Sequence, residues 1–362
     1  MKTKRTLSAI LAAAIAVCAI AGCGNNNAPA ATAANGTSTS APAADAVKTG
    51  VLSVLNVNEN EYSAMQNGIG KAADMLGAPA DAPEKPADAP EISRQNMSFV
   101  YFDTLDSMVM ALESGTVDQI QIPVSVAAYL ASNNDKFSAP PAPPADKPEP
   151  DRMTDMVIEN MKTGFAFMMR QDSKELRDDF DKAIAEMKAD GTLDKLVKEY
   201  ITDATSGEQK KVEFANNGSK TVKIAVTGAL PPMDYVAPDG TFAGFNTAIL
   251  AEIGKRLNIN IELKQVDSVG RATALSSGEV DAVFWTRVAP PRDDRPAPPE
   301  GEDDRGAREK ENNPVDPKER EIMDALNSGG SREQKGKMDM PEGTCVTDPY
   351  FTDAFVIVGL KK

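Results

Sequence analysis

The stretch ALESGTVDQIQI, residues 111–122, decides the fold because a close copy of it, ALSSGEVDAVFW, stands at residues 274–285. Each copy has the pattern of a helix end, a glycine that stops the helix, and a strand. One pair of copies at so long a separation indicates two similar α/β lobes and not a solenoid of short repeats. The identical positions are Ala111 and Ala274, Leu112 and Leu275, Ser114 and Ser277, Gly115 and Gly278, Val117 and Val280, and Asp118 and Asp281.

The residues around the first copy support this interpretation. An apolar stripe at i, i+3, i+4 and i+7 predicts one buried helix face before the copy. Gly115 suits the left-handed conformation that ends a helix, and a strand is predicted to start at Val117. The stripe consists of Leu105, Met108, Val109 and Leu112.

The N-terminus has the layout of a signal peptide, with basic residues before an apolar run that is too short to span a membrane. IAGC, residues 20–23, resembles a bacterial lipobox. We therefore predict a lipoprotein signal peptide over residues 1–22, a lipid such as palmitate on Cys23, and a flexible tether over residues 23–49. Ordinary secretion, with Cys23 as a bystander, is the alternative.

The composition excludes several classes of function. A formal net charge of −15 argues against binding to nucleic acid. The chain has no histidine, which removes the commonest general base and metal ligand. Cys18 leaves with the signal peptide and Cys23 carries the lipid, so Cys345 has no partner for an intramolecular disulfide. We expect no enzymatic activity, no cofactor and no metal.

Along the chain, strands alternate with helices of about ten residues, which predicts βαβ units with a mainly parallel sheet in each lobe. Asn246 is predicted to be the N-cap of a helix, and Asp239-Gly240 a turn. The other expected helices are Tyr62–Leu76, Val124–Ser132, two from Lys174 to Ile201, Val269–Ser277 and Lys318–Leu326. The expected strands are Val51–Val57, Phe99–Phe102, Phe165–Met169, Val222–Thr227, Asn260–Val266, Val280–Trp285 and Asp353–Leu360.

Three stretches carry a resemblance to a known family. They are VKIAVTGALPPMDYVAPDGTFAGFN (222–246), VTDPYFTDAFVIVGLKK (346–362) and LRDDFDKAIAEMKADGTLDKLVKEYI (176–201). They resemble the first-lobe start, the exit from the first lobe, and the C-terminal helices of the family 3 extracellular solute-binding proteins, which serve amino-acid ABC transporters. The resemblance implies a two-lobed α/β fold of the type II periplasmic-binding-protein kind.

The order of the lobes differs from that of the family. Residues 50–203 resemble the family's second lobe, residues 204–219 a linker, and residues 220–362 its first lobe with an insert over 289–342 that we expect to be disordered. The chain is therefore either circularly permuted or made of two truncated modules. We favour permutation, because each half supplies what the other lacks and the termini of compact domains often lie close together.

The predicted ligand site lies between the lobes, where strands end and helices begin. Tyr235 resembles the aromatic residue that stacks on the ligand in the family, and the alternative is that it packs on its own lobe. Asp234 is available to a ligand ammonium group. Phe245, at the Gly-Phe entry to a helix, completes this part of the predicted site.

The end of the strand in the second copy adds further candidates. Thr286 and Arg287 stand at this strand end, and an arginine fork matches a carboxylate. The family places its arginine somewhat further on, which makes Arg292 a rival, and either arginine is alternatively a surface charge. Trp285 is either a wall of the cleft or part of the core.

The first copy offers a ligand less. The resemblance implies an aspartate for the ligand ammonium group five residues after Asp118, and that position holds Pro123. Asp118 and Asp281 each follow a helix stop directly, so they are predicted to cap or pair at a strand start. The specific contacts to a ligand are therefore expected from the lobe that contains the second copy.

Together these features predict a monomeric, lipid-anchored solute-binding protein on the extracytoplasmic face of the cell membrane. It would deliver a small polar solute, an amino acid or related compound, to an ABC transporter permease. The alternatives are a ligand-binding sensor or scaffold lipoprotein with a degenerate cleft, and a dehydratase-type enzyme on the same fold.

Overall fold

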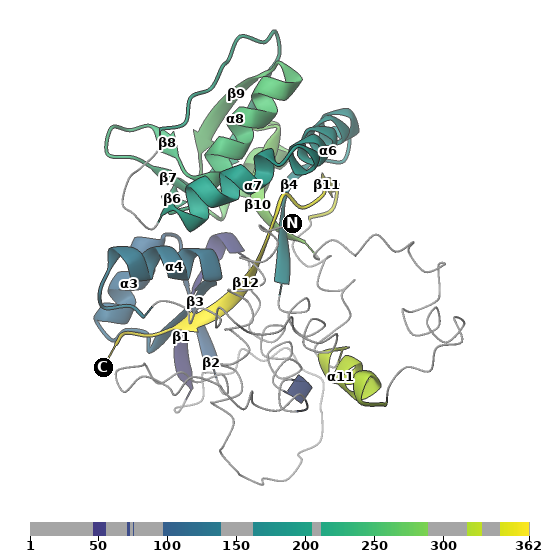
Figure 1. The fold of residues 1–362 in the computed structure, drawn as a ribbon. Coiled ribbons are helices and arrows are strands. Elements are labelled where there is room, and N and C mark those ends of the chain that lie inside the picture. The colour runs from purple at the N-terminus through teal and green to yellow at the C-terminus, as the bar shows by residue number, and fades with distance from the viewer. Residues whose placement is uncertain are drawn as a thin grey trace.

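The computed structural model describes residues 46–55, 71–72, 75, 97–138, 162–204, 211–288, 317–327 and 341–361. The strands of the main sheet are β1 (Val47–Leu52), β2 (Met97–Phe102), β3 (Gln119–Pro123), β4 (Lys162–Arg170), β5 (Thr221–Val226), β9 (Asn260–Gln265), β10 (Ala282–Val288), β11 (Thr344–Val346) and β12 (Phe351–Val358). Among the described residues they form one mixed sheet in the order β2-β1-β3-β12-β4-β10-β5-β9, and β11 pairs with β4. The sheet runs through two lobes, one above the other in Figure 1.

The first lobe, called lobe A here, is built on β1, β2 and β3, which are parallel to one another. A short 3-10 helix, η1 (Ser53–Leu55), follows β1. Two α-helices, α3 (Leu105–Glu113) and α4 (Val124–Asn133), flank β3 in the chain. The predicted helix ends as expected, because Gly115 has a φ of 72°. β1 begins three residues before the predicted start of the lobe.

The other lobe, lobe B, is built on β5, β9 and β10, with β5 parallel to both of its neighbours. A small antiparallel sheet lies beside it, formed by β6 (Ala229–Leu230), β7 (Asp234–Val236) and β8 (Phe242–Ala243). The helical elements of lobe B are α6 (Lys174–Ala189), α7 (Thr192–Val197), η2 (Lys198–Thr202), α8 (Phe245–Leu257) and α9 (Gly270–Ser276).

Two long strands, β4 and β12, connect the lobes. Residues 351–354 of β12 pair antiparallel with residues 162–165 of β4, and residues 355–358 pair antiparallel with β3 of lobe A. β4 continues into lobe B, where it pairs antiparallel with β10 and β11. The end of the chain therefore completes the lobe in which the described part of the chain begins. The sheet is mixed for this reason, whereas the pairs among β1, β2 and β3 and among β5, β9 and β10 are parallel as predicted.

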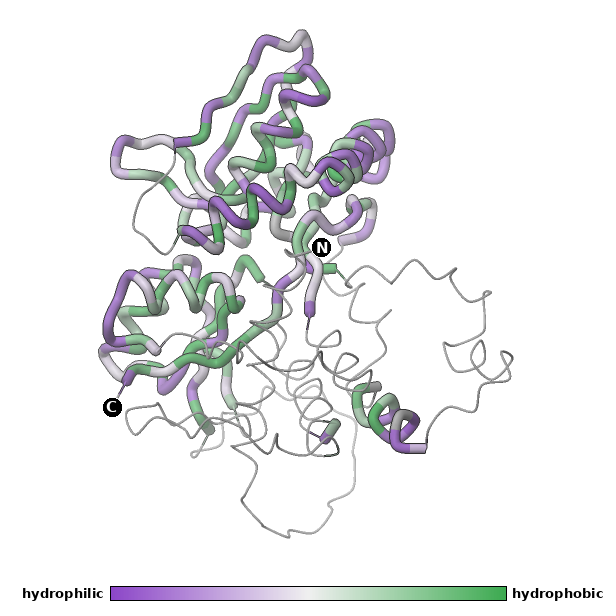
Figure 2. The backbone as a smooth tube through the Cα atoms, viewed as in Figure 1, coloured by the Kyte–Doolittle hydropathy of each residue, from purple (hydrophilic) through white to green (hydrophobic). Residues whose placement is uncertain are grey.

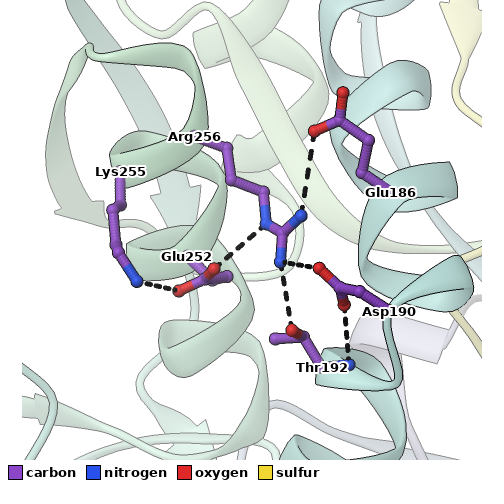
Figure 3. A network of polar contacts seen from close by, with 6 residues as sticks. All are labelled: Glu186, Asp190, Thr192, Glu252, Lys255 and Arg256. Carbon is purple, nitrogen blue, oxygen red and sulfur yellow. Dashed lines mark hydrogen bonds and ion pairs between the residues drawn. The ribbon is translucent and has the colours of Figure 1, made fainter.

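A polar network joins α6 and α7 to α8, although the strands β5 to β8 separate these helices along the chain (Figure 3). The Arg256 side chain is only 17% exposed. Its guanidinium contacts Glu252 Oε1 at 3.0 Å, Asp190 Oδ2 at 2.8 Å and Thr192 Oγ1 at 3.0 Å. The hydrogen bonds from Thr192 and Arg256 hold the pKa of Asp190 well below its usual range. Residues 174–197 thus pack on lobe B.

The prediction that Asn246 caps α8 is wrong. Gly244 is the N-cap, with a φ of 104°, and a Cβ atom there would lie 2.5 Å from the carbonyl oxygen of Met233. Asn246 is a buried residue of the first turn, and its amide N–H donates to Met233 O at 2.8 Å. A side-chain cap is unnecessary because loop carbonyls already accept the first amide N–H groups of the helix.

The strand predicted at Val51–Val57 is found only in part, because β1 ends at Leu52 and the 3-10 helix η1 follows; residues 56–57 lie outside the described residues. The remaining described elements agree with the predicted types, and the helix predicted at Lys318–Leu326 is found as α11 (Pro317–Asn327). The helix predicted at Tyr62–Leu76 lies mostly outside the described residues, as do Cys23 and Arg292. Hydrophobic residues follow β12 and the strands beside it, and polar residues follow the outer side of α6 (Figure 2). None of the helices in the described segments has the length and apolar character needed to cross a membrane.

Candidate functional site

The repeated stretch builds the same strand start in both lobes. In lobe A, Asp118 Oδ2 accepts from the amide N–H of Lys48 at 2.8 Å, and the Asp118 amide donates back to Lys48 O at 2.9 Å. In lobe B, Asp281 forms the same pair with Lys223, both at 2.8 Å. The predicted structural role of both aspartates is confirmed. The partner lysines are also recognisable in the sequence, because each follows a valine near the start of its strand: Val47-Lys48 in β1 and Val222-Lys223 in β5.

Arg271 connects the lobes and was missed in the sequence. It lies on α9 of lobe B, is 9% exposed, and donates from Nη1 to Val54 O at 2.9 Å. Its Nη2 donates to Phe284 O of β10 at 3.1 Å. A buried guanidinium on two backbone carbonyls, one from each lobe, holds η1 against lobe B. The sequence did contain a sign of this role. Arg271 lies at i−3 from Ala274 and i−4 from Leu275, so a charged residue falls on the apolar, buried face of α9.

Arg287, a predicted ligand contact, lies at the same junction. Its Nη1 donates to Leu55 O of η1 at 3.3 Å, and its guanidinium carbon lies 5.6 Å from the centre of the Phe355 ring. The side chain is half-buried. It stands at the carboxyl end of β10, as predicted, where it donates to a backbone carbonyl and lies against an aromatic ring.

Asp234, which was predicted to bind a ligand ammonium group, accepts hydrogen bonds from a loop of its own lobe. Its Oδ2 accepts from the amide N–H of Thr227 at 3.1 Å, from the Thr227 hydroxyl at 2.9 Å and from the Gly228 amide N–H at 2.7 Å. The residue is 2% exposed, and Oδ1 has no hydrogen-bond partner among the described residues. Burial raises the pKa of Asp234 to about 6.

Tyr235 is half-buried on β7. Burial raises the pKa of its phenol first, and the neighbouring phenols of Tyr129 and Tyr200 raise it further. Tyr129 stands on α4 of lobe A and Tyr200 on η2 of lobe B, two elements that contact each other across the junction. The sequence interpretation did not single out these two partners, since their approach depends on how the lobes meet.

The remaining predicted residues have different surroundings. Phe245 is fully buried, with its ring centre 5.0 Å from that of Phe351, so we leave it out of the site proposed below. Thr286 is 3% exposed, and its hydroxyl has no hydrogen-bond partner in the described segments. Trp285 belongs to β10, where the pairing with β4 shifts register, but its side chain is not among the described ones.

A second buried carboxyl, Asp353, was also missed. It lies on β12, where the lobes are joined, and its Oδ2 accepts from the amide N–H of Ser125 at 3.0 Å and from the Ser125 hydroxyl at 2.6 Å. Ser125 is in the first turn of α4, whose N-cap position is Pro123. Asp353 therefore supplies the cap that Pro123 lacks. Burial raises the pKa of Asp353 to about 6.

Groups of three or more Cys, Asp or Glu side chains that could hold a metal ion do not occur in the part of the chain that the structure describes. What the junction offers chemically is phenols, guanidinium groups and backbone carbonyls. Such groups are suited to binding a polar solute by hydrogen bonds and aromatic contacts.

The chain was compared with known proteins. The model of the bacterial extracellular solute-binding proteins, family 3, matches residues 91–203 and 222–294, just over half of the chain. No curated protein sequence matches.

Several solved structures are similar at low identity. A periplasmic binding protein of an ABC transporter from Brucella ovis with glutathione bound is 11% identical, with a TM-score of 0.35, over 88% of this chain and 63% of that one. An ancestral arginine-binding protein bound to arginine is also 11% identical, with a TM-score of 0.30, over 88% and 84%. The ligand-binding component of an ABC-type import system from Staphylococcus aureus, with zinc bound, is 12% identical, with a TM-score of 0.29, over 67% and 54%. The chain thus spans less than two thirds of the Brucella and Staphylococcus proteins.

The matched segments fall in both lobes. Residues 91–203 include β2, β3 and the helices up to η2, and residues 222–294 include most of lobe B. The chain belongs to the bacterial extracellular solute-binding proteins, family 3.

Proposed function

We propose that the protein captures a small polar solute between its lobes and delivers it to the permease of an ABC transporter. The observation that carries this proposal is the family match, which extends over both lobes. Within the described residues, two long strands, β4 and β12, connect the lobes, and this supports the proposal because such a connection permits hinge closure around a ligand.

The proposed binding region is the lobe junction, where Tyr235 and Arg287 of lobe B face α4 and η1 of lobe A. Contacts between η2 and α4 and between β10 and η1 support this location. Thr286, Trp285, Arg292 and Asp234 remain predicted ligand contacts. An amino acid or a related compound remains the predicted solute, and no catalysis is required for this role.

A thermal-shift screen of the purified full chain tests the proposal. Amino acids, small peptides and polyamines should be added at about a hundredfold excess over the dissociation constant, where a ligand adds about 3 kcal/mol to the free energy of unfolding. We expect at least one solute to raise the melting temperature, and Tyr235→Ala to abolish that shift. Tyr101→Ala is the matched control, because Tyr101 is 52% exposed on β2.

If no solute shifts the melting temperature, the transport role is wrong and a scaffold lipoprotein is favoured. A solute that is converted to product during incubation would indicate an enzyme instead.

We further propose that a lipid on Cys23 holds the protein at the extracytoplasmic face of the cell membrane. The signal-peptide layout and the IAGC stretch support this proposal. In fractionated cells, the wild-type chain should sediment with membranes and Cys23→Ser should not. Equal sedimentation of both chains would contradict lipid anchoring.

We also propose that the chain is circularly permuted relative to its family. The packing of α6 and α7 on lobe B and the pairing of β12 with β3 support this order. A rearranged chain, with residues 220–362 placed before residues 46–203, should fold and unfold with the same midpoint in urea. Failure of the rearranged chain to fold would favour two truncated modules.

A further inference from the structure

Besides the long strands β4 and β12, three pairs of elements bring the lobes into direct contact within the described residues. In each pair an element of lobe A meets one of lobe B: η1 meets β10, α4 meets η2, and α3 meets β6. η1 is enclosed there, because Val54 is 7% and Leu55 1% exposed. The lobes are therefore packed against each other by groups of the chain itself.

Two arginines of lobe B reach the carbonyls of η1. Arg271 of α9 donates from Nη1 to Val54 O at 2.9 Å, and Arg287 of β10 donates from Nη1 to Leu55 O at 3.3 Å. The Arg287 guanidinium also lies 5.6 Å from the ring centre of Phe355 on β12. We call the two arginines and these two carbonyls the arginine latch. Since the carbonyls belong to successive residues of one turn, the latch holds η1 at two neighbouring points.

Arg271 is positioned for this contact by its own lobe. Its Nη2 donates to Phe284 O of β10 at 3.1 Å, and the residue is 9% exposed. Because α9 and β10 both belong to lobe B, this bond fixes the direction of the planar guanidinium, and little side-chain freedom is lost when the lobes close. The carbonyl of Val54 replaces water that the guanidinium loses on burial. The latch therefore needs no further molecule to complete it.

The latch lies in the region where a solute is proposed to bind. η1 follows the carboxyl end of β1, and Arg287 stands at the carboxyl end of β10. Ligands of open α/β sheets bind beyond the carboxyl ends of the strands. The latch thus joins two strand ends that should separate when a solute enters, and their separation requires both arginines to leave η1.

We propose that the arginine latch keeps the two lobes closed on each other when no solute is bound. Opening of the latch is then the step that admits a solute. This inference rests on the proposed function and deepens it, because it describes how access to the same site is regulated. The alternative is a protein that is open at rest and that closes only around a solute.

The separation of the lobes can be measured without a solute. Nitroxide labels at Met110→Cys on α3 and Val269→Cys at the start of α9 would report it by double electron–electron resonance on the full chain, since Met110 is 69% and Val269 81% exposed. Serine replaces the three native cysteines, so that only the two labels are present. With the latch intact, we expect one main population at the shorter distance.

The double variant Arg271→Ala/Arg287→Ala should gain a second population at a longer distance. The ratio of closed to open molecules should fall about a hundredfold, because two hydrogen bonds from charged donors are lost at about tenfold each. If circular dichroism shows that the double variant does not fold, Arg287→Ala alone should still lower the ratio about tenfold.

Arg256→Ala is the matched control. Arg256 is also a largely buried arginine, 17% exposed, but its partners Glu252, Asp190 and Thr192 all lie within lobe B. Its loss should destabilise the fold and leave the distance distribution unchanged.

The same distance distribution with and without the two arginines would overturn the latch, and so would an equal shift in Arg256→Ala. A chain with an intact latch that is mostly open would overturn it as well. None of these measurements involves a solute, so their failure leaves the proposed function intact. A negative solute screen, in contrast, would reject the proposed function without affecting the measured separation of the lobes.

Discussion

Lobes A and B share a framework and differ in the groups that they present to each other. In both, a Val-Lys strand start pairs with the aspartate of the repeat, and a left-handed glycine ends the helix before it. At the junction, lobe A presents the backbone carbonyls of Val54 and Leu55, and lobe B presents two arginine side chains. The repeat therefore builds the same strand start in both lobes, and the groups that differ between the lobes at the junction lie outside it.

The largest effect is expected from removing the contact between the lobe B arginines and the lobe A carbonyls. Arg271→Ala removes a buried guanidinium from two carbonyls, Val54 O and Phe284 O, which then lose their donor. We expect the free energy of unfolding to fall by about 3 kcal/mol in urea denaturation. Arg271→Lys keeps the positive charge but cannot donate to both carbonyls through a planar guanidinium. Its free energy of unfolding should therefore lie between those of the wild type and the alanine variant.

Arg287→Ala is the matched comparison, since it removes one hydrogen bond of 3.3 Å and the contact with Phe355 from a half-buried site. A loss of about 1 kcal/mol is expected. Equal losses for both alanine variants would show that Arg271 does not have the larger part in joining the lobes.

Two buried carboxyls allow a second comparison. Asp234 binds a loop of lobe B, and Asp353 lies on β12, the strand that connects the lobes. Burial raises the pKa of Asp234 and of Asp353 from 3.8 to about 6 in the folded state. The folded state then binds more protons than the unfolded state between pH 4 and 6, so each carboxyl lowers the free energy of unfolding as the pH rises through that window. The change is at most about 3 kcal/mol per carboxyl.

Asp353→Asn cannot titrate, so its stability relative to the wild type should improve between pH 4 and pH 7, as measured by urea denaturation at both values. The stability of Asp234→Asn relative to the wild type should likewise increase from pH 4 to pH 7. A stability difference that stays constant with pH would mean that the carboxyl is not protonated preferentially in the folded state.

The two aspartates of the repeat, Asp118 and Asp281, should differ less in their contributions to the free energy of unfolding. Asp281 also lies 3.6 Å from Nη2 of Arg170, whose Nη1 donates to Val280 O at 2.8 Å. Asp281→Ala should therefore cost about 1–2 kcal/mol, and Asp118→Ala, at an exposed strand start, should cost less. Arg170→Ala should remove most of the difference between the two. An equal effect of both aspartate substitutions in the wild-type background would contradict this explanation.

The sequence was informative for most of the structure that depends on neighbours along the chain. The stripe ending at Gly115, the paired aspartates and the alternation of elements were predicted, because helix periodicity and glycine stops are local. The error at Asn246 has a local cause as well. An Asn before an apolar run favours a cap, but the tight approach of Gly244 to Met233 O moves the helix start two residues earlier.

The groups at the junction depend on contacts across long stretches of chain. Arg271 bonds to a carbonyl 217 residues away, and Ser125 to a carboxylate 228 residues away. Nothing in the sequence near either residue specifies its partner. Tyr129 and Tyr200 were not singled out for the same reason, since their elements α4 and η2 lie far apart in the chain and contact each other only in the folded structure.

The helix-ending glycines give the smallest effect and test the part that both lobes share. Gly115 and Gly278 have φ values of 72° and 75°, and a Cβ atom at either would meet no other atom within 4 Å. Alanine should therefore destabilise the fold only through the left-handed backbone, by about 1 kcal/mol and by the same amount at both sites. Asparagine tolerates this conformation better, so Gly115→Asn and Gly278→Asn should cost less than the alanine variants. Urea denaturation of the four variants would reveal a difference between the lobes, and a clear inequality between the two alanine variants would mean that the repeat does not end both helices in the same way.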